Sequence, residues 1–241
     1  MDAGTALRLP AAVTQQPCAD AAVQAVALAQ HVAAALRAAL AQRDHALLLV
    51  SGGRSPVAFF EQLGACELDW GRIIVSLVDE RCVGVGSMDR NDALVRRHLL
   101  RGPAAAASFV PLIDAGDDAA AELPGARQRL APLPWPADVV VLGMGADGHT
   151  ASWFPGADGT AAAMAPQSAE RVAIVRPTTA PHTRLTLTLP VVLQARQILL
   201  PIEGAAKRAV LERAATAEAG ELPVTAVLQQ RDAPVRVFHC P

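Results

Sequence analysis

The segment VLGMGADGHTASWFPG, residues 141–156, decides how the chain is interpreted. It continues a run of Val and Leu and contains the spacing G-x-G-x-x-G from Gly143, which is typical of dinucleotide-binding loops. Such a loop needs a long helix after its third glycine and an acidic residue at the end of the next strand. Here Pro155 interrupts any helix, and Glu170 precedes the next apolar run instead of ending it. The sequence therefore excludes a dinucleotide loop.

The same segment contains a candidate acid–base pair. Its glycines leave room for a small ligand beside Asp147 and His149. Histidine is the side chain best suited to move protons near neutral pH. A lone histidine is more often structural, but this one follows Asp-Gly at the end of an apolar strand. We therefore expect His149 and Asp147 to be catalytic residues.

Outward from this segment, apolar strands alternate with helices along the whole chain. Continuous apolar strands are typical of a parallel sheet that helices cover on both faces. We therefore expect an α/β fold with a mainly parallel sheet, as a single domain over residues 1–241. The expected helices are at about 19–43, from about Pro56, at 91–100 and at 205–215; the expected strands are 46–50, 73–79, 108–113, 138–143, 171–175, 184–189, 197–202 and 235–240, with a Pro-rich connection at 124–136.

Composition excludes several classes of function. The formal net charge of -2 gives no overall attraction to nucleic acid or to an anionic membrane. No export signal is expected, and the Ala-rich stretch 21–36 has the polarity of an amphipathic helix rather than a membrane span. The four cysteines form no C-x-x-C pair, which suits a reducing cytoplasm and argues against a structural zinc. They are Cys18, Cys66, Cys82 and Cys240.

Ligands of open α/β sheets bind at the carboxyl ends of the strands, so the segments there are the candidate binding loops. The strand 46–50 is followed by SGGRSP, in which two glycines allow a tight turn and Ser55 is expected to cap the next helix. The start of that helix suits a phosphate, although an ordinary strand–helix turn has the same sequence features. Asp79-Glu80-Arg81 follows another strand, and such a triplet alone is more often a surface cluster. Arg184 and Lys207 add positive charge at further strand and helix ends.

Taken in order, these segments resemble the 6-phosphogluconolactonase family and, more distantly, the glucosamine-6-phosphate isomerase/deaminase family. The resemblance is carried by SGGRSP, DERCV, Asn91 before a helix, GMGADGHTASWFP, RLTLTLP and EGAAKRAVL. It implies a Rossmann-like sheet and a cytoplasmic enzyme of the pentose phosphate pathway that hydrolyses 6-phosphoglucono-δ-lactone without a cofactor or metal. It implies a sugar phosphate as the partner, and we expect a monomer that binds neither nucleic acid nor membrane.

The resemblance also implies the roles of individual residues. Ser51, Gly52 and Gly53 match the family's phosphate-contacting loop, and Arg184 and Lys207 match its basic partners. Asp79 and Arg81 match the segment that lines the sugar pocket, and Asp147 and His149 match the catalytic D-G-H. The implied mechanism has His149 as the general base on a water molecule. Arg81 or backbone N–H groups of the glycine loop would stabilise the oxyanion.

The chain departs from the family pattern at several positions. Val83-Gly84 stands where the family often has Val-Pro, Arg90 stands where it often has Ser, and the lysine common before the arginine at 184 is missing from TTAPHTR. Two other functions stay open. A deaminase would carry a glutamate where this chain has Phe154 and a tyrosine where it has Arg81. A non-enzymatic sugar-phosphate sensor on the same scaffold is the other alternative.

Overall fold

The computed structural model describes residues 6–53, 55–114, 116–218 and 220–241, so Arg54 of the SGGRSP segment lies outside the described residues. The main sheet has seven strands, and all neighbouring strands in it are parallel. Their spatial order is β1 (Val13–Pro17), β10 (Val235–Cys240), β9 (Ile198–Glu203), β6 (Val139–Val141), β2 (Ala46–Val50), β3 (Ile73–Leu77) and β5 (Ser108–Val110). The expected α/β fold with a mainly parallel sheet is confirmed.

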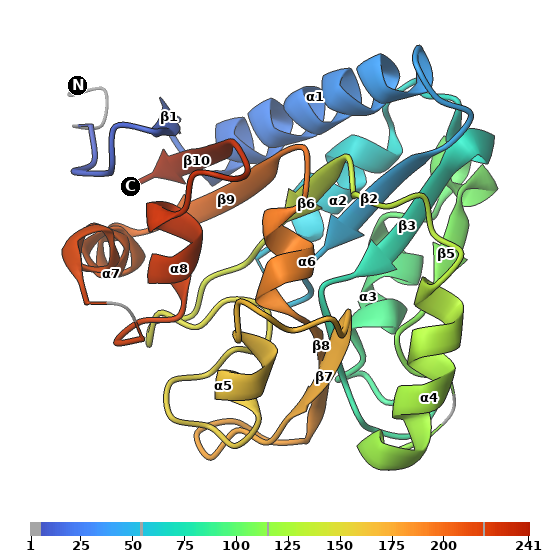
Figure 1. The fold of residues 1–241 in the computed structure, drawn as a ribbon. Helices are drawn as coiled ribbons and strands as arrows, with labels where there is room; N and C mark the ends of the chain where they lie inside the picture. Colours follow the sequence, from blue (N-terminus) through green and yellow to red (C-terminus); the bar gives the residue numbers. More distant parts are fainter. Residues whose placement is uncertain (1–5, 54, 115, 219) are drawn as a thin grey trace.

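The helices form two groups on opposite faces of this sheet. The chain passes through α1 (Ala21–Leu40), α2 (Val57–Gly64) and α3 (Asn91–His98) while it adds strands toward β5. It passes through α4 (Ala119–Leu130), α6 (Leu189–Leu193), α7 (Ala205–Thr216) and α8 (Val224–Gln229) while it adds strands in the other direction. Because such crossovers are right-handed, the two groups cover opposite faces, as Figure 1 shows for α1 against α6–α8. The direction reverses between the neighbouring strands β2 and β6.

A second, antiparallel sheet joins the first at the carboxyl edge. Its order is β4 (Asp79–Arg81), β8 (Arg184–Leu187) and β7 (Val172–Val175). The single strand expected at 73–79 is therefore wrong, because β3 ends at Leu77 and β4 pairs with β8 instead. Val78 connects the sheets: its N–H donates to the Val50 carbonyl and its carbonyl accepts from Leu187 N–H. The Asp79-Glu80-Arg81 triplet thus lies at the junction of both sheets, not in a surface cluster.

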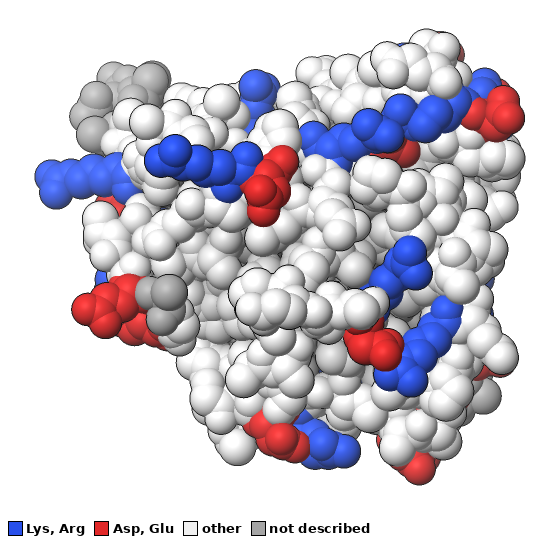
Figure 2. All heavy atoms as spheres, viewed as in Figure 1, with Lys and Arg blue, Asp and Glu red and all other residues white. Residues whose placement is uncertain are grey.

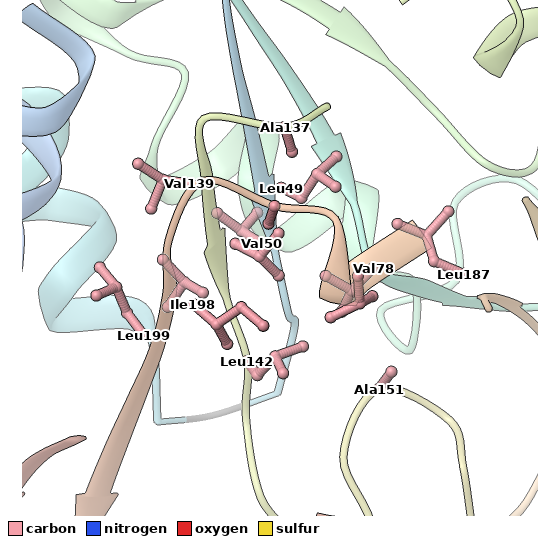
Figure 3. Close-up of a cluster of buried hydrophobic side chains, with 14 of the residues drawn as sticks. Leu49, Val50, Val78, Ala137, Val139, Leu142, Ala151, Leu187, Ile198 and Leu199 are labelled. Atoms are coloured by element: carbon pink, nitrogen blue, oxygen red, sulfur yellow. The ribbon is translucent and has the colours of Figure 1, made fainter. Parts of the chain in front are cut away.

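One hydrophobic core links the sheets and the helices. Figure 3 shows Leu49 and Val50 of β2 packed beside Val139 and Ile198 of the neighbouring strands, and Leu187 of β8 extends the same cluster. All five of these side chains are completely buried. This burial fixes the carboxyl ends of β2 and β6 rigidly, which are the ends that carry the candidate binding loops.

Helix α1 is longer than the Ala-rich stretch seen in the sequence. It is the one described helix whose length and composition would allow it to cross a membrane. Its apolar stripe, which includes Leu28, Val32 and Leu36, is buried in the core against the sheet. The apolar content of α1 is therefore explained by packing on the sheet, as expected for an amphipathic helix.

Other differences from the expected elements are local. The short elements β1, α5 (Thr160–Ala163), α6 and α8 and the two 3₁₀ turns Trp70–Arg72 and Gly102–Ala106 were not predicted. Pro124 lies inside α4 rather than in a connection. Ser55 does not cap α2, because the preceding residue of that helix is Pro56 in a helical conformation and no side chain bonds the first turn. A capping side chain needs an extended residue at that position.

The surface carries charges of both signs. On the face shown in Figure 2, Lys and Arg side chains lie interspersed with Asp and Glu around a broad uncharged area. This mixture follows the small net charge of the chain.

Candidate active site

The candidate site lies where β2 and β6 diverge. Beyond β2 the chain turns to one face of the sheet, and beyond β6 it turns to the other, which leaves a crevice between the two loops. Ser51 follows β2 and Gly143 follows β6, and the Gly143 N–H donates to Ser51 Oγ at 2.9 Å across the crevice. A cavity of about 250 Å³ opens there. The strand-end rule applied to the sequence therefore predicts the right edge of the sheet.

The cavity brings together almost all of the predicted site residues. They come from β2, β4, β6, β8 and the start of α7, five elements that are far apart in the sequence. The predicted residues that line it are Ser51, Gly52, Gly53, Asp79, Arg81, His149, Arg184 and Lys207. Asp147 does not line the cavity but is in contact with the His149 side chain.

His149 and Asp147 form a hydrogen-bonded pair. His149 Nδ1 lies 2.5 Å from Asp147 Oδ1, and the same oxygen accepts the His149 backbone N–H at 3.2 Å. Gly148, with φ of 78°, reverses the chain between them. The pair needs a glycine at 145, since a Cβ there would lie 2.2 Å from His149 Cε1. With Nδ1 held by the carboxylate, Nε2 is the nitrogen left to act on a ligand.

Phe154 supports the imidazole from the side. Its ring stacks on that of His149, with centroids 4.1 Å apart and planes at 28°. The Arg184 guanidinium lies 5.5 Å from the same ring. Phe154 is buried, so it presents a fixed apolar surface to both groups. From the sequence, Phe154 stands out only as a position without the deaminase glutamate, and its packing against His149 is not predicted.

Arg184 and Asp79 form a buried pair at the cavity wall. Arg184 Nη1 lies 3.9 Å from Asp79 Oδ2, and that oxygen also accepts a 2.5 Å hydrogen bond from Ser152 Oγ. Burial lowers the pKa of the Arg184 guanidinium below its usual value, and Asp79 opposes this effect. The Oδ2 atom of Asp79 is therefore held by Arg184 and Ser152, while the residue also lines the cavity. Ser152 was missed, although it stands within the quoted motif.

The Arg81 guanidinium has one nitrogen bonded to the protein and one without a described partner. Its Nη1 donates to the Asp89 carbonyl at 2.7 Å. Its Nε is buried and has no hydrogen-bond partner among the described residues. A buried donor without a partner is rare in proteins and points to a ligand or water. Arg81 also lines a second, adjoining hollow with His149 and Phe154.

Asn91 and Glu80 complete the wall and were not assigned by the sequence. Asn91 lines the cavity, donates through Nδ2 to the Asp79 carbonyl and fits against Gly52, whose Cβ would lie 2.0 Å from Asn91 Oδ1. Glu80 lies behind it with 0% exposure. Burial raises the pKa of the Glu80 carboxyl to about 7, against three backbone hydrogen bonds that favour the charged form.

Arg90 has a structural position. It is buried, bonds Asp92 through two of its nitrogens and donates to the Ile113 carbonyl at 2.7 Å. Where the family pattern often has a serine, this chain therefore has a side chain that ties the start of α3 to the loop after β5. Within the described residues, no group of three His, Cys, Asp or Glu side chains is arranged to hold a metal ion.

The fold and the site define an α/β protein with an acid–base pair and a cationic cavity at the point where its sheet reverses direction. The chain belongs to the family described as glucosamine-6-phosphate isomerases/6-phosphogluconolactonase, whose model matches residues 19–236. It is 49% identical to the 6-phosphogluconolactonase of Pseudomonas aeruginosa over 234 residues, which cover 96% of this chain and 93% of that one.

Solved structures agree with this membership. The crystal structure of a 6-phosphogluconolactonase from Shewanella baltica has a TM-score of 0.93 and 35% identity, and covers 98% of this chain and 100% of its own. A monomeric glucosamine-6-phosphate deaminase has a TM-score of 0.73 at 19% identity, with 95% and 97% coverage, and shares the fold. The resemblance stated from the sequence motifs is confirmed.

Proposed function

We propose that this protein hydrolyses 6-phospho-D-glucono-1,5-lactone to 6-phospho-D-gluconate, as a cytoplasmic enzyme of the pentose phosphate pathway. The observation that carries the proposal is that the His149–Asp147 pair adjoins the same cavity as the Ser51–Gly53 loop, Arg184 and Lys207. The test is lactone hydrolysis by the purified protein, corrected for spontaneous opening. A rate equal to the spontaneous one would contradict the proposal and favour a non-enzymatic sugar-phosphate sensor.

The phosphate of the substrate is assigned to the end of the cavity formed by the Ser51–Gly53 loop and Lys207. Lys207 stands in the first turn of α7, where a cation opposes the helix dipole unless an anion binds nearby. The first turn of α2 follows the loop and has no side-chain cap, so its N–H groups suit an anion. With Arg184, two cations are available to bind a dianion through charge-assisted hydrogen bonds.

The reaction needs one base and one group that binds the oxyanion. His149 Nε2 takes a proton from water as the water oxygen bonds to C1 of the lactone. The tetrahedral intermediate then breaks its bond to the ring oxygen, which receives the proton from the imidazolium. Asp147 fixes the imidazole through Nδ1 and stabilises its charged form. A carboxylic acid is left at C1 and loses its proton to the solvent to give the carboxylate, and no covalent intermediate is needed.

Arg81 is the group that we assign to the oxyanion. Three N–H groups of the glycine loop already have partners: Gly143 donates to Ser51 Oγ, Gly145 to the His149 carbonyl and Gly148 to the Gly145 carbonyl. The buried Nε of Arg81 has no described partner. A fixed donor at the position where charge develops stabilises the transition state more than the ground state.

Lys207→Ala should raise KM for the phosphorylated lactone roughly 10- to 150-fold, which corresponds to roughly 1.5–3 kcal/mol for a lost charged hydrogen bond. kcat should change little, because Lys207 binds the part of the substrate that does not react. Kinetics on the phosphorylated lactone and on glucono-δ-lactone without phosphate separate the two effects, since only the first should respond. Arg213→Ala, an exposed cation on the same helix, is the control. An unchanged KM in Lys207→Ala would show that the phosphate of the substrate does not bind at this end of the cavity.

Glucosamine 6-phosphate should bind weakly but should not be converted. Its deamination requires proton transfer between C1 and C2, and the apolar ring of Phe154 stacks on His149 where the deaminase pattern has a carboxylate. The measurement is ammonia and fructose 6-phosphate after incubation with protein whose lactone hydrolysis has been verified. Efficient release of ammonia would favour the deaminase instead.

A further inference from the structure

Glu80 has a position that the proposed chemistry does not use. It stands between Asp79 and Arg81 in β4, and successive side chains of a strand point to opposite sides. Asp79 and Arg81 line the cavity, whereas the Glu80 carboxyl is completely buried. A buried carboxyl is unfavourable unless its oxygens have hydrogen-bond donors, so its partners show what it does.

Those partners are backbone N–H groups at the cavity wall. Oε1 accepts from Arg81 N–H at 2.7 Å and from Asn91 N–H at 2.8 Å, and Oε2 accepts from Asp92 N–H at 2.8 Å. Asn91 and Asp92 begin α3, whose first N–H groups have no partner within the helix and no cap from Arg90. Glu80 therefore caps a helix from a different strand and joins the two segments that carry Arg81 and Asn91.

We propose that Glu80 is a positioning residue, whose carboxylate fixes β4 to the start of α3 and so holds the Arg81 guanidinium and the Asn91 carboxamide in place to bind the substrate. The proposal rests on the proposed function for the identity of the ligand, but its hydrogen bonds are independent of any reaction. Only the ionised carboxylate offers acceptor lone pairs on both oxygens without a competing O–H donor. Protonation therefore weakens the link between the two segments.

The direction of the pH effect follows from this. The Glu80 carboxyl has its pKa raised to about 7 by burial, with a smaller contribution from Asp92. Above that pH the carboxylate holds the three N–H groups, and below it the neutral acid does so less well. The charged or titratable groups around it are Asp92 and Arg90 at the start of α3 and Asp79, Arg81, Cys82 and Arg184 at the sheet junction.

The test compares Glu80→Gln, a neutral mimic of the protonated side chain, with the unchanged protein. The probe is 6-phosphogluconate, and its Kd is measured for both proteins from pH 5.5 to 8.5. The Kd of the Glu80→Gln protein is divided by the Kd of the unchanged protein at each pH. The titration of the probe affects both values equally and cancels in this ratio. We expect a ratio of roughly 5- to 10-fold at pH 8.5, which corresponds to the net contribution of about one ordinary hydrogen bond, and a ratio near 1 at pH 5.5. Glu170→Gln, the same change at an exposed carboxylate outside the cavity, should give 1 throughout.

Each outcome has a separate meaning. A ratio that does not vary with pH shows a merely structural effect and overturns the proposal. Tighter binding by Glu80→Gln also overturns it, because the charge would then act only by repelling the anionic probe. Absence of binding to the unchanged protein would instead contradict the proposed function.

A second measurement needs no variant and covers the case in which Glu80→Gln fails to fold. The amide hydrogens of Arg81, Asn91 and Asp92 should exchange with solvent more readily below about pH 7, after correction for intrinsic rates. Protection that stays constant between pH 8 and pH 6 at these three positions would overturn the proposal.

Discussion

His149→Ala should lower kcat for the phosphorylated lactone by ~10²–10⁴-fold, the contribution usual for a general base. KM should change little, because the assigned phosphate contacts come from Lys207, Arg184 and the loop after β2. The measurement is steady-state hydrolysis after subtraction of the spontaneous rate. His45→Ala removes an exposed histidine before β2 and serves as the matched control.

The interpretation of this variant depends on an intact fold. His149 is partly exposed, and its bonds are local to the loop, so the far-UV circular dichroism and the unfolding midpoint should stay close to those of the unchanged protein. A folded His149→Ala protein with near-normal kcat would show that another group activates the water. Asp147→Asn should also lower kcat, since the amide replaces one carboxylate oxygen by an N–H donor and removes the charge that stabilises the imidazolium.

The candidate site could be predicted from the sequence because its chemistry follows strand ends. Ser51 and His149 each come directly after or close to a buried apolar run, and parallel strands bring such ends to one edge. The short spacing in D-G-H places Asp147 beside the imidazole with a glycine to turn the chain. For these residues, local sequence determines local geometry, so the prediction needed no tertiary information.

Other parts of the site depend on partners that the sequence does not reveal. IIVSLVD, residues 73–79, reads as one strand, and only the pairing of Asp79–Arg81 with β8 moves its last residue into a second sheet. Side chains alternate along a strand, so the sequence could have predicted that Glu80 points away from the side of Asp79 and Arg81. Its burial against Asn91, however, depends on where α3 packs. Phe154 and Ser152 likewise acquire their roles only when the loop after β6 folds back on β8.

Gly145→Ala should abolish most lactone hydrolysis while changing stability little, a loss that approaches that of His149→Ala. The added Cβ would lie 2.2 Å from His149 Cε1, 2.3 Å from its Nδ1 and 2.6 Å from Asp147 Oδ1. These atoms belong to side chains, so the loop can accept the methyl group by moving them, and the movement separates the base from its carboxylate. The backbone at 145 does not have a positive φ, so alanine adds no conformational strain of its own.

The effect of Gly145→Ala should therefore appear in catalysis rather than in folding. Gly71→Ala is the matched control, because its Cβ would meet only Asp69 Oδ1 at 3.9 Å, an ordinary contact far along the chain from the motif. The measurements are kcat, Kd for 6-phosphogluconate and the unfolding midpoint of both variants. A large fall in kcat with a nearly unchanged Kd would locate the damage at the His149–Asp147 pair. Full activity in Gly145→Ala would mean that the imidazole works from a position other than the one bonded to Asp147, and the assignment of that carboxylate would have to be abandoned.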